Sequence, residues 1–205
     1  MTETLSTVGW PPGEWGRNPV STMLTPPTEE PITVAEAKLR AGLDWPTTDP
    51  REDLMKKFLA TARRKVETDA CLAFLTQERQ IQYDAVPAVL QLPVRPLQAV
   101  SIGITYQDGS TTTLDPSAYL VDLAGGRIAF VTPPTNLRVF QPWTFTVTAG
   151  YEDVDDVPPE LVHLVGILVA HYATLGRDLA LVDEMFQVPY GYDDLIAPWR
   201  PEVLT

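Results

Sequence analysis

One stretch, residues 143–175, shows both common hydrophobic periods in succession. Its first part alternates between apolar and threonine side chains, which predicts a half-buried β-strand from Trp143 to Ala149. Pro158 and Pro159 follow an acidic loop and suit the first turn of a helix, where a fixed φ is tolerated and no N–H is needed. Over residues 161–175 apolar positions occupy nearly every side of this helix, so we expect it to be buried against other helices and a sheet.

Two further helices are predicted before residue 76. Thr33 and Glu36 have the spacing of a capping box, and Gly42 ends a short helix. Asp49 and Pro50 then begin an amphipathic helix of about six turns. Its apolar side is predicted to carry Leu54, Met55, Phe58, Leu59, Ala62, Val66 and Ala70, and its polar side Lys56, Lys57, Arg63, Arg64 and Glu67.

Strand-like alternation fills the region between the helices, at residues 79–83, 100–106, 118–122 and 127–131. Asp108-Gly109 supplies a hairpin turn after the second of these strands. Because helices and strands are segregated, we predict an α+β fold: a small helical bundle around a buried helix, with an inserted antiparallel β region and extended arms at both ends. The expected division is residues 1–30 (N-terminal arm), 31–75 (first helical half), 76–151 (β region), 152–178 (buried helix) and 179–205 (C-terminal arm).

The two arms leave alternatives open. Residues 1–30 have no period and contain five prolines, which fits either a mobile tail or an extended arm that orders against a neighbour, and Trp10 and Trp15 favour the arm. The C-terminal segment is rich in aromatic residues but too short to fold alone. Its side chains either pack back on the core or anchor in another subunit.

Composition narrows the range of functions. The chain has 205 residues with 15 basic and 27 acidic side chains, a net charge of -12, which argues against a surface that grips nucleic acid phosphates. Its single cysteine, Cys71, cannot form an internal disulfide, and this fits synthesis in a reducing cytoplasm. No apolar run is long enough to span a membrane and no secretion signal is recognisable, so we expect no membrane contact.

Candidate chemistry is sparse. His163 and His171 would lie about 12 Å apart along a helix, too far for one metal ion. Asp153, Asp155 and Asp156 resemble part of a calcium loop but lack its glycine and closing glutamate, and a solvated loop ahead of a helix is the simpler interpretation. Cys71 has no nearby histidine and fits a buried, inert thiol. We therefore predict no catalytic residue, no metal, no cofactor and no enzymatic activity.

Several short motifs follow one another in a specific order and with specific spacing over residues 31–200. They are Pro31-Ile32-Thr33 with Glu36-Ala37-Lys38, Ala62-Arg63 with Val66-Glu67, Leu75-Thr76-Gln77, Leu92-Pro93 with Pro96-Leu97-Gln98-Ala99-Val100, Tyr119-Leu120-Val121-Asp122, Ala149-Gly150-Tyr151 with Val157-Pro158, and Ala197-Pro198-Trp199-Arg200. In this set the chain resembles the head–tail connector, or adaptor, proteins of tailed bacteriophages and phage-like gene transfer particles. It departs from their pattern at Cys71, where a glycine is usual, and at Glu78-Arg79, where a Thr-Trp pair is usual.

The resemblance implies a ring, commonly of twelve subunits, seated under the portal protein and joined to the next neck or tail protein. It implies a protein made in the host cytoplasm that ends in the neck of a virion or phage-like particle, with DNA passing through the channel without specific binding. The candidate portal contacts are Tyr190, Tyr192, Leu195, Ile196, Trp199 and Arg200, and the candidate contacts with a neighbouring subunit or the neck are Trp10 and Trp15.

Two other classes of function stay open from the residues alone. One is a free-standing binding module whose β region recognises a host or cell-surface ligand. The other is a metal-dependent hydrolase that uses the acidic loop at Asp153 to Asp156.

Overall fold

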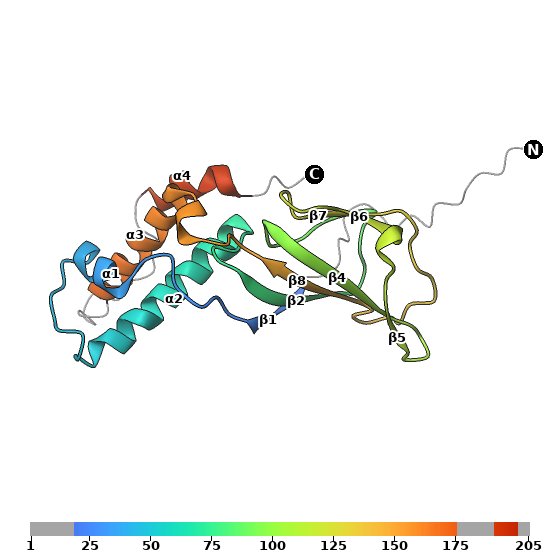
Figure 1. Cartoon of the computed structure of the whole chain (residues 1–205), viewed down its shortest axis with the longest axis horizontal. Helices are drawn as coiled ribbons and strands as arrows, with labels where there is room; N and C mark the ends of the chain where they lie inside the picture. The colour runs from blue at the N-terminus through green and yellow to red at the C-terminus, as the bar shows by residue number, and fades with distance from the viewer. Residues whose placement is uncertain (1–18, 176–190, 201–205) are drawn as a thin grey trace, which may run out of the picture.

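The computed structural model describes residues 19–175 and 191–200. The molecule is elongated, with helices gathered at one end and two β-sheets at the other (Figure 1). All strand pairings within the two sheets are antiparallel. The predicted α+β class is confirmed, with a helical part and a β part that have separate hydrophobic cores.

The helical part contains α1 (Val34–Arg40), α2 (Arg51–Ala70), α3 (Pro159–Leu175) and α4 (Tyr192–Ile196), with short 3-10 turns at Val154–Asp156 and Ala197–Trp199. The predicted capping box is present: Glu36 N–H donates to Thr33 Oγ1 at 3.2 Å, and Thr33 N–H donates to Glu36 Oε2 at 2.8 Å. Helix α2 begins one residue later than predicted, and Asp49 Oδ1 accepts from Arg51 N–H at its start.

Helix α3 is the centre of the helical core, as its apolar pattern predicts. Leu164, Val165, Leu168 and Val169 are fully or almost fully buried, and α1, α2 and α4 all pack against it. Gly166 allows the Arg40 side chain to approach, since a Cβ at that position would lie 2.3 Å from Arg40 Nη1. The side of α3 that carries His163 and Thr174 is exposed to solvent.

The β part has a five-stranded sheet in the order β1-β2-β8-β4-β5 and a three-stranded sheet in the order β3-β7-β6. The strands are β1 (Val20–Thr25), β2 (Gln77–Tyr83), β3 (Val89–Gln91), β4 (Leu97–Thr105), β5 (Thr111–Thr113), β6 (Tyr119–Asp122), β7 (Arg127–Phe130) and β8 (Trp143–Ala149), with a 3-10 turn at Pro116–Ala118. The alternation predicted for β8 is confirmed by its burial pattern, in which Trp143, Phe145, Val147 and Ala149 are buried. The core lies between the two sheets.

Three strands, β1, β3 and β5, are not among the strands predicted from the sequence pattern. Strand β1 falls within the segment expected to be an aperiodic arm, and it pairs with β2 at the edge of the sheet. Its residues are nearly all exposed, so it has no buried face that could produce an alternating pattern. Strands β3 and β5 have only three residues each, too few for a period to be recognised.

The polar side predicted for α2 is wrong at two positions. Arg63 and Glu67 are buried, whereas Leu54, assigned to the apolar side, is exposed. The reason is that the β part and the segment before α1 cover the C-terminal half of α2, where Glu67 bonds β-part residues and Arg63 bonds Glu30. Burial there extends beyond the apolar stripe because the charged side chains find partners.

Three chain segments cross between the helical and β parts. The segment after β1 ends at Glu30 beside α2, and the outgoing and returning segments of the β part run side by side, bridged at Leu75 and Tyr151. Gly150 is required at this crossing: its φ is +119°, and a Cβ there would lie 2.3 Å from the carbonyl oxygen of Leu75. The two parts are therefore joined closely.

Candidate assembly surfaces

The C-terminal helix α4 packs on the helical core. Tyr192 and Ile196 are buried there, and the Tyr192 hydroxyl donates to Asp69 Oδ2 at 2.8 Å. Burial, and then the hydrogen bond to the Asp69 carboxylate, raises the pKa of Tyr192. The C-terminal segment was expected either to pack on the subunit's own core or to anchor in another subunit. Tyr192 and Ile196 pack on the subunit's own core.

The other described candidates of this segment, Leu195, Trp199 and Arg200, lie nearer the surface. Leu195 and Arg200 are exposed, and Arg200 Nη2 pairs with Asp193 Oδ1 at 2.6 Å. Trp199 is half-buried against the helical core, and its carbonyl accepts from Arg95 Nη2 at 2.7 Å. The side chains of this segment that a partner can reach are therefore those of Leu195, Trp199 and Arg200.

Three candidate contact residues, Tyr190, Trp10 and Trp15, lie outside the described residues. The sequence assigns them as contacts with the portal, a neighbouring subunit or the neck, and these assignments stay predictions.

Glu67 is the centre of a buried polar cluster where the helical and β parts meet. It is 1% exposed. Its carboxylate accepts from Arg63 Nη1 at 3.0 Å, Arg79 Nη2 at 2.9 Å, Gln77 Nε2 at 2.8 Å and Phe74 N–H at 3.0 Å. Arg63 also bonds Glu30 at 2.8 Å, so the cluster ties α2 to β2 and to the segment before α1. It fixes the position of one part against the other.

The two arginines of this cluster have different electrostatic surroundings. Burial disfavours the charge on Arg63, but Glu67 and Glu30 outweigh it and raise the pKa of Arg63. At Arg79 burial outweighs the attraction of Glu67 and lowers the pKa of that guanidinium. Arg79 Nε also has no hydrogen-bond partner among the described residues. The cluster is a structural junction whose charges depend on one another.

Large apolar side chains are exposed at both ends of the molecule. The exposed fractions are 81% for Leu39 in α1 and 74% for both Val139 and Phe140 in the loop between β7 and β8. Sequence reasoning did not identify these residues, because single apolar residues in a loop or a short helix carry no period. Exposed apolar side chains that lie together can mark an interaction site, and Val139 and Phe140 are neighbours in one loop.

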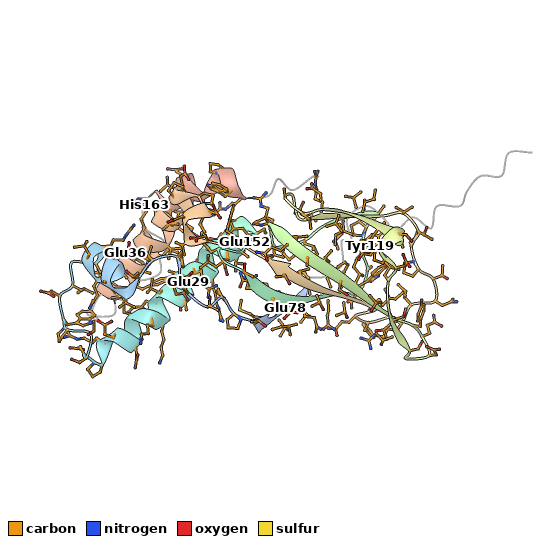
Figure 2. The ribbon with its side chains drawn as sticks, in the orientation of Figure 1. Glu29, Glu36, Glu78, Tyr119, Glu152 and His163 are labelled. Atoms are coloured by element: carbon orange, nitrogen blue, oxygen red, sulfur yellow. The ribbon has the colours of Figure 1, made fainter. Side chains whose placement is uncertain are left out.

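The acidic loop does not form a metal site. Asp153 Oδ1 accepts from Asp155 N–H at 3.0 Å, so that carboxylate caps a 3-10 turn. Within residues 19–175 and 191–200, no group of three or more His, Cys, Asp or Glu side chains is placed to hold a metal ion. Figure 2 shows Glu29, Glu36, Glu78 and Glu152 at separate places along the molecule. Acidic side chains thus do not converge on one point in the described chain.

The histidines and the cysteine have structural surroundings. His163 is exposed, with Nδ1 at 3.5 Å from Arg40 Nη1, and burial lowers the pKa of His171. Cys71 takes the left-handed conformation at the end of α2, with φ of 50°, in the place where a glycine is usual. Burial raises the pKa of its thiol, which disfavours the reactive thiolate.

None of the helices in the described residues combines the length and the apolar character needed to cross a bilayer.

Comparisons with known proteins give structural likeness only. No protein family description matches the chain, and no curated protein matches it. Among solved structures, a chain from the neck of the empty gene transfer agent (GTA) particle, determined with C6 symmetry, matches with a TM-score of 0.66 and 20% identity over 91% of this chain and 97% of that one. A chain from the virion of the native GTA particle matches with a TM-score of 0.65 and 18% identity, over 90% and 97% of the two chains.

A third match is a chain from the neck of the native GTA particle, determined with C12 symmetry. It has a TM-score of 0.63 and 19% identity, over 91% of this chain and 97% of that chain. The likeness covers both the helical and the β part, so the chain shares its fold with components of GTA particles. This agrees with the sequence resemblance to the adaptor proteins of phage-like particles.

Proposed function

We propose that this chain is a structural subunit of a ring in the neck of a tailed phage or gene transfer agent particle. In this role it is a head–tail connector that joins the portal of the DNA-filled head to the next neck or tail protein. The observation that carries the proposal is the fold: it matches chains of GTA particles over nine-tenths of this chain and nearly their whole length. A non-enzymatic role agrees with the neck and virion sources of these neighbours.

The shape of the subunit supports a connecting role. The helical end and the β end carry different surfaces, so each can contact a different partner. Two of the similar chains belong to necks determined with C6 and C12 symmetry. We infer that copies of this chain form a ring, because heterologous contacts between identical subunits close into rings. The C12 symmetry of one of these necks supports twelve copies.

We assign the portal contact to the C-terminal segment. Tyr192 and Ile196 anchor this segment in the subunit, while Leu195, Trp199 and Arg200 remain accessible to a partner. Tryptophan and arginine are the residue types that dominate binding energy at interfaces. Tyr190, in the same segment, belongs to the proposed contact, as do Trp10 and Trp15 for a neighbouring subunit or the neck.

The proposed ring surrounds DNA without binding it specifically. The outer face of the five-stranded sheet supports this, because it carries hydroxyl and amide side chains instead of basic ones. They include Thr22, Gln80, Gln82, Ser101, Thr113, Thr144, Thr146 and Thr148, with Glu78 as a charged neighbour. A subunit of net charge -12 also repels phosphates.

The experiment that tests the function is assembly with the portal. We expect the full chain, mixed with the portal protein of the same particle, to sediment with portal rings and to appear by cryo-EM as a twelve-fold ring on one portal face. A protein that stays monomeric and never associates with portal rings contradicts the proposal and favours a free-standing binding module.

A second measurement tests the assigned portal contact. The double change Leu195→Asp and Arg200→Glu should reduce co-sedimentation with the portal by at least about tenfold while the melting temperature stays within a few degrees. The matched control is Leu123→Asp, an exposed apolar residue of the β part. If the control and the tail variant bind the portal equally well, the portal contact lies elsewhere.

A further inference from the structure

Phe140 is the only exposed Phe, Tyr or Trp residue within residues 19–175 and 191–200. Phe140 and its neighbour Val139 are each 74% exposed. They lie in the loop between β7 and β8, at the end of the β part that is farthest from the helices (Figure 1). We call residues 138–142 the apolar knob. An aromatic side chain left in water beside a second apolar one is an unusual feature of this surface, because aromatic residues are among the main anchors of protein interfaces.

The apolar knob is held at its base by main-chain hydrogen bonds. Arg138 N–H donates to Thr105 C=O at 3.1 Å, and Thr105 N–H donates to Pro142 C=O at 2.9 Å. Both backbone groups of one residue at the end of β4 thus close the loop. Val139 and Phe140 lie between the two bonds.

Two further hydrogen bonds fix the tip of the apolar knob. Gln141 adopts a φ of 47°, a left-handed conformation directly after Phe140. Its N–H donates to Asp84 Oδ1 at 2.8 Å, and its carbonyl accepts from Arg138 Nη2 at 2.9 Å. A loop that is already ordered loses little conformational entropy when it binds, so its apolar side chains can contribute most of their burial energy to a contact.

The apolar knob is also fastened to the turn between β4 and β5. Gln107 N–H donates to Asn136 C=O at 3.0 Å, and Tyr106 and Leu137 form an antiparallel bridge. The side chains of Tyr106 and Leu137 are partly buried against the β core. The two loops therefore form one tip, and the knob has a fixed position on the β part.

The place of the apolar knob limits what can cover it. The C-terminal segment, to which we assign the portal contact, packs on the helical core, in the other part of the molecule. In the proposed connector the two ends of the subunit contact different proteins along the neck. Copies around the ring then meet along their sides, and the end that carries the knob stays uncovered by them. This end faces the protein that follows the ring.

The charges at this tip indicate the kind of surface that fits it. Arg138 is exposed and places a positive charge beside Val139 and Phe140. The acidic groups of the tip bond their own surroundings: Asp84 accepts from Gln141 N–H, and Asp108 accepts from Ser110 N–H at 2.9 Å. A complementary surface is therefore an apolar pocket with carboxylate or carbonyl oxygens at its rim, which can accept from the guanidinium group.

We propose that the apolar knob inserts into such a pocket on the next neck or tail protein. The inference rests on the ring of the proposed function and names what the β end of that ring contacts. Phe140 is the central anchor of the contact, and Val139 and Arg138 flank it. The portal contact at the helical part and the knob at the β end are then used at the same time by different partners.

The small size of the apolar knob has a consequence for the order of assembly. Specific interfaces bury about 800 Å² on each partner, far more than two side chains provide, so a single knob binds weakly. A ring presents one knob per copy to the same partner assembly, and linked contacts can exceed a single affinity by roughly 10²–10⁴-fold. The next protein is therefore expected to attach after the ring has formed on the portal, and not to free subunits.

Complementation of an extract tests the contact. Producing cells that lack this chain supply heads, tails and the other neck proteins, and the purified full chain is added. Electron microscopy then counts rings on portals and heads that carry tails. Phe140→Ser should form portal rings like the unchanged chain but lower the fraction of tailed heads by at least about tenfold. The matched control is Leu123→Ser, at an exposed apolar residue of the same β part, and should alter neither count.

Photo-cross-linking identifies the occupant directly. The chain with Phe140→p-benzoylphenylalanine keeps a large aromatic group at the knob and is irradiated in assembled particles. Mass spectrometry of the product should show the protein on the tail side of the ring. The same analogue at Leu123 should not cross-link to that protein.

The order of assembly has a separate readout. We expect the unchanged chain, mixed with the extract after its heads have been removed by sedimentation, to form no stable complex with tails. Tails should join once portal-bearing heads are returned. A stable complex of tails with the chain in the absence of portals would show that no ring is needed and would overturn this part of the inference.

The outcomes separate the contact from the function. If Phe140→Ser forms portal rings and joins tails like the unchanged chain, the knob is not the contact and the connector function stands. A cross-link from position 140 to a neighbouring copy or to the portal also overturns the inference. The same holds if a variant with an unchanged melting temperature loses the portal ring itself. If the unchanged chain forms no rings on portals, the proposed function fails first and this contact fails with it.

Discussion

The helical part and the β part are stabilised in different ways. The β core relies on aromatic packing, with Tyr83 and Phe145 edge to face at 5.5 Å between ring centroids and Phe130 against Trp143 at 5.0 Å. The helical part adds buried or partly buried polar links to its apolar core: Lys38 with Glu52, Arg63 with Glu67, and Tyr192 with Asp69.

The difference follows from the kind of chain segments that each part joins together. The β strands are joined by main-chain ladders, so their side chains need only fill the space between two sheets. The helical part must instead fix segments that are far apart in the sequence, at Glu30, Arg79 and Tyr192, and polar links specify where each one docks. Charge changes should therefore damage the helical part and its junction more than the β part.

The largest effect is expected at the centre of the helical core. Leu168→Asp places a charge at a position that is 2% exposed in α3, where an unpaired charge costs several kcal/mol, comparable to the whole stability of a domain. We expect loss of the folded protein, measured by circular dichroism and soluble yield. The matched control, His163→Asp on the open side of the same helix, should remain folded.

The second-largest effect is expected at the Glu67 cluster, where the helical and β parts meet. Glu67→Ala leaves Arg63 and Arg79 buried without their shared carboxylate, and breaking such a group costs about 3–5 kcal/mol of unfolding free energy. Urea denaturation measures the loss. Glu78→Ala in the neighbouring strand, where the carboxylate makes one hydrogen bond at the surface, should cost less than about 1 kcal/mol. Equal losses in the two variants would show that the cluster does not stabilise the junction.

Two buried tyrosines compare the parts directly. Tyr192→Phe removes a hydrogen bond to the Asp69 carboxylate and should cost about 1.5–3 kcal/mol. For the Tyr83 hydroxyl no hydrogen-bond partner is found among the described residues, so Tyr83→Phe should be nearly neutral. Chemical denaturation at pH 7 checks both. A larger loss for Tyr83→Phe would contradict the view that polar links distinguish the helical part.

The same tyrosines predict a loss of stability at alkaline pH. Burial raises the pKa of Tyr83 and of Tyr192, so each stays protonated in the folded protein while the unfolded chain ionises near pH 10. The unfolded state then binds fewer protons, and the unfolding free energy falls as the pH rises through about 10. Each Phe variant should show a shallower fall between pH 9.5 and 11, measured by denaturant titrations at several pH values.

The smallest effect is expected at a helix end. Thr33→Ala removes the hydroxyl that accepts from Glu36 N–H at the start of α1 and should cost about 1 kcal/mol. Thr61→Ala in the exposed middle of α2 is the control and should change stability by less than about 0.5 kcal/mol. Equal stability of the two variants would show that the capping box does not stabilise the start of α1.

The sequence predicts most of the fold because its long elements have strong periods. Helices α2 and α3, strand β8 and the capping box at Thr33 all follow from local patterns. Strands β1 and β3 could not be predicted, since one lacks a buried face and the other is very short. Arg63 and Glu67 were placed on the polar side because their partners, Glu30 and Arg79, lie on other elements that no helical period can reveal.

Prediction of the candidate contact residues from the sequence is limited in a similar way. Aromatic composition identified the C-terminal segment, but only the structure separates Tyr192 and Ile196, which are buried, from Leu195 and Arg200, which are exposed. The position of Val139 and Phe140 depends on the pairing of Thr105 with residues 138 and 142, a contact between distant segments. Exposure of this kind is a property of the folded surface and leaves no pattern in the sequence.

The three chain crossings have a mechanical consequence. A joint made by one peptide segment bends freely, but here the segment ending at Glu30 and the paired segments at Leu75 and Tyr151 cross together, with the Glu67 carboxylate held by groups on both sides. Any rotation of one end against the other must stretch all of these links at once. The subunit should therefore resist bending between its two parts, so that a force applied at one end is transmitted to the other.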